Sequence, residues 1–89
     1  MPREHLENAA RAVSRAATAT HGAARERLES QADQLERLAT APRGPDHGRL
    51  ARHEHVLSEI AAAEDGAVAD HVTEALESIR AYRETLPGV

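Results

Sequence analysis

The sequence predicts an all-α protein of four short helices, arranged as an antiparallel up-down bundle or as two packed helical hairpins. Ala, Leu, Glu, Arg and Gln, which have high helix propensity, dominate its 89 residues. Glycine recurs every 22 residues, at Gly22, Gly44, Gly66 and Gly88, as expected of residues just past helix C-termini. Apolar side chains recur with the same offset, in the sets Leu6, Leu28, Leu50 and Val72, and Val13, Leu35, Leu57 and Ile79. We interpret the offset as four helices of equal length rather than a duplication, because the polar positions match poorly.

The first two helices are predicted at about residues 2–19 and 23–40. Pro2 suits the first position of a helix, and Glu4 lies in the first turn, where the helix dipole favours an acid. The short connection at residues 20–22 leaves one longer, bent helix as the alternative. The apolar stripe of the first helix is small enough for a neighbour to approach closely. The two stripes consist of Leu6, Ala9, Ala10, Val13, Ala16 and Ala17, and of Ala24, Leu28, Ala32, Leu35, Leu38 and Ala39.

A break at residues 41–45 separates the two helix pairs. Its two prolines prevent a continuous helix, and Asp46 follows as an N-cap. The third and fourth helices are predicted at about residues 46–64 and 67–85, joined by a turn at Asp65-Gly66. Their stripes consist of Leu50, His53, Leu57, Ile60 and Ala61, and of Val68, Val72, Ala75, Leu76, Ile79, Tyr82 and Leu86.

The composition excludes several classes of protein. Without cysteine the chain has no disulfide, no thiolate metal site and no thiol nucleophile. It has no apolar run long enough for a transmembrane helix and no signal-peptide segment at its start, so we expect a cytoplasmic protein with one domain, residues 1–89. The net charge is −4 and arginines alternate with glutamates, so we expect no nucleic-acid and no membrane partner.

The predicted core is thin. Only 17 side chains are large and apolar, counting Leu, Ile, Val, Met and Tyr. A domain of this size is already marginal. We therefore expect self-association, as a dimer, because the stripes of the third and fourth helices are the most apolar.

Three segments carry a resemblance to known proteins. DHGRLARHEHVLSEI, AYRETLPGV and LESQADQLERLA are similar to an uncharacterised family of small helical proteins from halophilic archaea. The exclusive use of arginine among the basic residues, with abundant Ala and Glu, fits such a source, whereas a net charge of −4 is mild for it. The resemblance implies no activity, so it assigns no functional residues.

The six histidines do not form a recognisable metal motif. His53 and His55 point about 200° apart on a helix and cannot chelate one ion together. His55 and Glu59 are four residues apart and can share an ion or form a surface hydrogen bond. No Glu lies three residues before a histidine, as a carboxylate-bridged di-metal bundle requires, and no HExxH occurs. We expect no cofactor, and a ligand- or metal-binding bundle that uses histidines near His53 is the alternative.

Two polar residues fall on apolar stripes. His53 lies between Leu50 and Leu57, and Gln31 holds the equivalent place on the second helix. Polar groups that face a bundle can fix helix register or oligomeric state. The alternative is a half-exposed position at the edge of each stripe.

The remaining candidates are Arg49, Arg52 and Tyr82. Arg49 and Arg52 form a polar patch with His53 at the start of the third helix, where an anion is favoured, although Asp46 would occupy that place as the cap. Tyr82, the only aromatic residue, is expected to fill the core, with ligand stacking as the alternative. We expect no catalytic residues, because the serines lie mid-helix without an evident base. The sequence thus predicts a small non-catalytic structural or protein-interaction module that self-associates or binds an unidentified protein partner.

Overall fold

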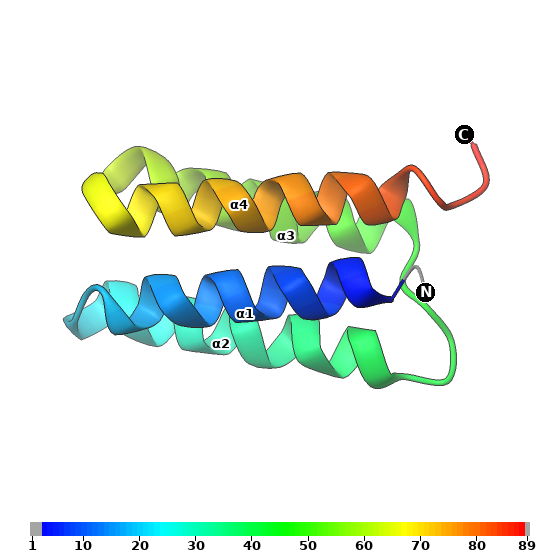
Figure 1. Ribbon diagram of the computed structural model, residues 1–89, viewed down its shortest axis with the longest axis horizontal. Helices are drawn as coiled ribbons and strands as arrows, with labels where there is room; N and C mark the ends of the chain where they lie inside the picture. Colours follow the sequence, from blue (N-terminus) through cyan, green and yellow to red (C-terminus); the bar gives the residue numbers. More distant parts are fainter. Residues whose placement is uncertain (1–2, 89) are drawn as a thin grey trace.

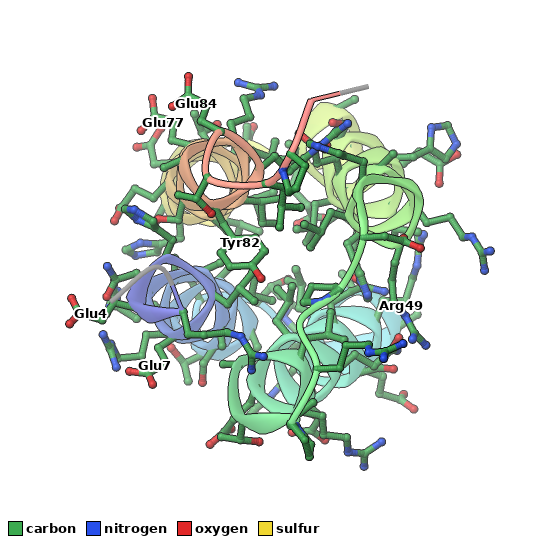
Figure 2. The ribbon with its side chains drawn as sticks, turned by 90° about the vertical axis from the view of Figure 1, so that its right-hand side faces the viewer. Glu4, Glu7, Arg49, Glu77, Tyr82 and Glu84 are labelled. Atoms are coloured by element: carbon green, nitrogen blue, oxygen red, sulfur yellow. The ribbon has the colours of Figure 1, made fainter. Side chains whose placement is uncertain are left out.

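The computed structural model describes residues 3–88, and it confirms the all-α up-down bundle. Its helices are α1 (Glu4–Thr18), α2 (Gly22–Thr40), α3 (His47–Ala63) and α4 (Gly66–Arg83). Seen end-on, they follow one another in the order α1, α4, α3, α2, and neighbours run antiparallel (Figures 1 and 2). Every boundary lies within two residues of its predicted position. The predicted role of Pro2 at the start of the first helix falls outside the described residues.

The glycines that recur every 22 residues do not share one role. The chain reverses between Thr18 and Gly22, so α1 and α2 are separate helices and not one bent helix. Gly22 and Gly66, the first residues of α2 and α4, have φ angles of 69° and 60°, which glycine adopts without strain. Gly44 is needed for a different reason, since a Cβ there would lie 2.5 Å from the hydroxyl of Tyr82.

Most of each predicted stripe lines the interior of the bundle, whereas five of the predicted stripe residues are only partly buried: Ala24, Ala32, Leu38, Ala61 and Leu86. In α1 the stripe is mostly alanine, and this helix lies close against both α2 and α4, as its small side chains predicted. Helix α3 packs on α4, whereas the backbones of α2 and α3 lie farther apart and long side chains such as Arg27 and Glu59 meet between them. The largest fully buried side chains come from all four helices: Leu6, Val13, Leu28, Leu35, Leu50, Leu57, Val72 and Ile79. No helix among the described residues has both the length and the apolar character needed to cross a membrane.

The connection between α2 and α3 is held at both of its ends. Asp46 Oδ1 accepts a hydrogen bond from the Arg49 amide at 2.8 Å, which confirms the predicted N-cap. Arg3 reaches across from the start of α1 and satisfies carbonyl groups that the end of α2 leaves without helical partners. Its Nη1 donates to the carbonyl oxygens of Leu38 at 3.1 Å, Ala39 at 3.1 Å and Ala41 at 2.6 Å.

The two hairpins, α1–α2 and α3–α4, correspond to each other. Helix α2 begins at Gly22 and α4 begins 44 residues later at Gly66. Leu6 and Leu50 are separated by the same offset, and both are 0% exposed. In this alignment α1 corresponds to α3 and α2 to α4. The interface between α1 and α4 therefore has a counterpart in the interface between α3 and α2.

Candidate functional site

His53 and Gln31 meet each other across the α2–α3 interface. His53 Nδ1 lies 2.7 Å from Gln31 Oε1. Because a carbonyl oxygen only accepts, Nδ1 carries the proton and donates it in this bond. His53 is 7% exposed and Gln31 is half-buried. Of the two residues, only Gln31 therefore lies at the edge of its stripe. The sequence placed both residues on stripes, and the structure adds that they bond to each other.

The second ring nitrogen of His53 faces solvent. Within residues 3–88, every fully buried side-chain nitrogen or oxygen has a hydrogen-bond partner, and Nε2 of His53 has none among these residues. Nε2 must therefore reach water. It does so through a groove of about 630 Å³ between α2 and α3, which His53 lines. In this tautomer Nε2 can accept a hydrogen bond or take up a proton.

The surroundings of His53 favour its neutral form. Burial is the main cause that lowers the pKa of His53 below its ordinary 6.5, and the positive charges of Arg49 and Arg52 lower the pKa further. At neutral pH the imidazole is therefore uncharged. The bond to Gln31 and the acceptor at Nε2 both belong to this neutral state.

The groove carries opposite charges at its two ends. Glu26 and Glu29 of α2 line it towards the α1–α2 turn, Asp33 lies between them and Arg37 along α2, and Arg37 and Arg49 line it towards the α2–α3 connection. Arg49 lies between α3 and α2, on the side away from α1 and α4 (Figure 2). We call this feature the central groove.

A second hollow adjoins the central groove at the α2–α3 connection. Its volume is about 830 Å³, and it shares Leu38 and Arg49 with the groove. Arg43 and Arg52 also line it, so we call it the arginine hollow. The structure therefore brings together Arg49 and Arg52, which the sequence grouped, and adds Arg43 from the connection.

Tyr82 lies beneath this region and is closed to ligands. It is 4% exposed and points into the interior of the bundle (Figure 2). Its hydroxyl lies directly under Gly44. Tyr82 thus fills the core, as predicted, and its ring is not available for stacking.

Sequence reasoning missed a network between α3 and α4. Glu54 pairs with Arg80, whose Nε lies 3.7 Å from Oε2, and with the guanidinium of Arg83. Arg83 Nε donates to His47 Nδ1 at 3.1 Å, and His47 Nε2 donates to the carbonyl oxygen of Pro87 at 3.1 Å. The network fastens the segment after α4 to the start of α3. Its members lie up to 40 residues apart, and no local spacing indicates such contacts.

The histidines do not gather around a metal position. Within residues 3–88, no three His, Asp or Glu side chains are placed to hold one ion. His55 Nε2 lies 3.6 Å from Glu59 Oε2, but both side chains are exposed and His53 is not part of the pair. The geometry gives the metal-binding alternative no support.

Comparisons with known proteins place the chain in a family without defining an activity. No curated protein and no solved structure matches the chain. A family model described as a family of unknown function, DUF7553, matches residues 1–85, which include all four helices. The expected relationship to an uncharacterised family is confirmed by this match. The chain belongs to the family of unknown function DUF7553.

Proposed function

We propose that this chain is a non-catalytic interaction module that self-associates as a dimer through the face formed by α2 and α3. The observation that carries the proposal is the open α2–α3 interface, where the helix backbones lie farther apart and leave a groove with charges of opposite sign at its two ends.

The apolar stripes of α3 and α4, which first suggested a dimer, are used inside the chain. Val72, Leu57 and Ile79 are 0% exposed within one bundle. Apolar area for a partner remains instead on the α2–α3 face. Leu38 lines the central groove and the arginine hollow, and Val56 lines a smaller hollow near Glu26; both are only partly buried.

The size of this face suits a dimer. Helices α2 and α3 form the broad back of the molecule in Figure 1, whose Cα extents are 36 and 22 Å along that face. A face of these dimensions is close to the roughly 800 Å² that each partner buries in a standard interface.

The charges on the face are complementary to those of a second copy. In a two-fold dimer each surface meets its own copy in reversed orientation. Such a pairing places Arg37 and Arg49 of one chain against Glu26 and Glu29 of the other. Opposite charges that meet in this way favour one orientation and penalise others.

The cellular setting we propose is the cytoplasm of a halophilic archaeon, which the exclusive use of arginine supports. At about 1 M salt the Debye length is roughly 3 Å, so only charges in direct contact still attract. Ion pairs at the interface must therefore be close, and the apolar contacts of Leu38 and Val56 carry more of the association.

Analytical ultracentrifugation of the full chain, at low salt and in 2 M KCl at about 10 to 300 µM protein, tests the proposal. We expect a dimer in both conditions. Arg49→Glu and Glu26→Arg should each shift the equilibrium to monomer, and the double variant should restore the dimer because the charges are exchanged. Arg15→Glu is the control, since Arg15 pairs with Glu74 on the opposite face. A monomer in both salts, or no rescue in the double variant, rules out this interface.

A further inference from the structure

We propose that the arginine hollow is a binding site for a compact polyvalent oxyanion of the phosphate type. The proposal goes beyond self-association, because it concerns a ligand bound by a single chain.

The partners of the arginines set this hollow apart. Seven of the eleven arginines contact a carboxylate, a carbonyl oxygen, or the Asn8 side chain within the described residues. The other four make neither an ion pair nor a side-chain hydrogen bond with any residue from 3 to 88, and all four lie at one end of the α2–α3 face: Arg37, Arg43, Arg49 and Arg52. Although the net charge of the chain is −4, these four unpaired arginines give one end of the α2–α3 face a local excess of positive charge, which favours the binding of an anion.

The hollow takes its arginines from three parts of the chain. Arg49 and Arg52 lie three residues apart, on one side of α3, and Arg43 comes from the connection. Arg37 stands beside them on α2, in the adjoining groove. Among residues 3–88, Asp46 is the one acid that lines the hollow, and its Oδ1 accepts a hydrogen bond from the Arg49 amide at 2.8 Å. One carboxylate against the lining arginines leaves the hollow positively charged.

The floor of the hollow is fixed before any ligand arrives. Arg3 holds the end of α2 through three carbonyl oxygens, and Asp46 caps α3. Between them Pro45 is buried and Gly44 lies against Tyr82. A fixed backbone lowers the ordering cost of binding, which then falls only on the exposed arginine side chains.

The side chains that line the arginine hollow indicate the class of ligand. Guanidinium groups present planar pairs of donors that match phosphate oxygens, and several such groups suit a polyvalent anion. No aromatic ring is available to stack on a base, because Tyr82 is buried and the chain has no Phe or Trp. We therefore assign the site to the phosphate group itself and not to a nucleobase.

Titration with pyrophosphate, followed by ¹H–¹⁵N NMR of the full chain, tests the site. Chloride is adjusted to keep the ionic strength constant, and all titrations use the Glu26→Arg background, which the dimer proposal expects to be monomeric. We expect saturable shifts of the amides at residues 43–52. The double variant Arg49→Gln/Arg52→Gln should weaken binding at least tenfold, which corresponds to about 1.4 kcal/mol. Arg43→Gln, outside any helix, should weaken it at least threefold.

Arg15→Gln, a paired arginine on α1, is the control and should bind like the Glu26→Arg background. Shifts that rise linearly without saturation, or equal affinity in the double variant, would overturn the proposal, as would an equal loss in the control. Circular dichroism confirms that each variant is folded. The two proposals can fail separately: pyrophosphate binding by a chain that never dimerises overturns only the dimer, and a chain that dimerises but binds no pyrophosphate when it is monomeric overturns only the anion site.

Discussion

The α1–α4 and α3–α2 interfaces correspond in the two hairpins, yet one is closed and the other is open. With the offset of 44 residues that separates Gly22 from Gly66, His53 corresponds to Ala9 and Gln31 to Ala75. Ala9 and Ala75 are both 0% exposed where α1 lies close to α4. The same two places in α3 and α2 hold the hydrogen-bonded polar pair, and there the two helix backbones lie farther apart.

The difference shows how side-chain size decides which face of a near-symmetric bundle is open, because Ala12 and Ala16 of α1 likewise correspond to the larger Val56 and Ile60 of α3. Alanine lets two helix backbones approach until they exclude every other group. A histidine and a glutamine in the same places need room for a ring, an amide and the hydrogen bond between them, so the helices stay apart. The space left beside the pair becomes the central groove, which neighbouring charged residues line. Specific contacts with a partner thus become possible on one face and not on the other.

The largest loss of stability is expected when a polar side chain of the open α2–α3 interface is introduced at the corresponding position of the closed α1–α4 interface. Ala9→His forces an imidazole into a site that is 0% exposed and closely packed. Overpacking and the burial of an unpaired polar group each cost about 1–3 kcal/mol, so we expect a loss of roughly 3 kcal/mol or more in the free energy of unfolding. Urea denaturation measures the loss. Ala62→His, at an exposed position of α3, is the control and should change stability by less than about 0.5 kcal/mol. Equal losses in both variants would show that the α1–α4 interface is not tightly closed.

A smaller loss is expected when the polar pair is broken from its glutamine side. Gln31→Ala leaves the buried Nδ1–H of His53 without its acceptor. Such a group costs about 1–3 kcal/mol, and we expect the lower half of this range because Nε2 already reaches water. Gln34→Ala removes only a surface hydrogen bond to Ser30 at 3.1 Å and serves as the control on the same helix. If thermal unfolding ranks the two variants equally, the buried bond contributes no net stability.

Sequence patterns predicted the helices and their inward faces, because helical period and capping are local properties. The Asp46 cap, the alanine stripe of α1 and the place of His53 on the stripe of α3 were all readable in this way, whereas the burial of His53 was left open. The openness of the α2–α3 interface could not be predicted from the sequence. A stripe shows which residues face inward, but it does not show the distance between two packed helices. The unpaired state of Arg43 and its neighbours was equally hidden, because an unpaired charge is recognised only after the partners of all other charges are known.

Replacing His53 by an apolar residue should make the open α2–α3 interface more like the closed α1–α4 interface. His53→Leu exchanges a buried polar ring for a side chain that packs against Leu50 and Leu57, and Gln31 can turn to water. Replacing buried polar groups by apolar ones of similar volume is often neutral or stabilising. We expect the free energy of unfolding to rise by up to about 1 kcal/mol. We also expect the distribution of oligomers to change, because the helices that form the proposed interface come closer. Sedimentation that is unchanged in this variant would remove His53 from any role in setting the oligomeric state.

The most modest effect is a pH dependence confined to the open interface. Burial first, and then Arg49 and Arg52, lower the pKa of His53 below 6.5, so the unfolded chain binds a proton there more readily than the folded one. The stability that neutral His53 provides is therefore fully present above about pH 6.5, and it is lost as the pH falls from there towards the lower pKa of the folded state. The acids that line the groove with His53, namely Glu26, Glu29 and Asp33, counteract the arginines.

Thermal unfolding of the natural sequence and of His53→Leu, measured in parallel between pH 7.5 and 5, isolates this contribution. Both proteins keep the five other histidines, so any titration of those groups appears in both curves. We expect the natural sequence to lose more stability than the variant below pH 6.5, and the two curves to run parallel above it. Curves that run parallel over the whole range would mean that His53 takes up its proton equally well in the folded and unfolded chains. The imidazole would then be as well hydrated as a free one, and the groove beside it would be too open to make the pair with Gln31 a fixed feature of the interface.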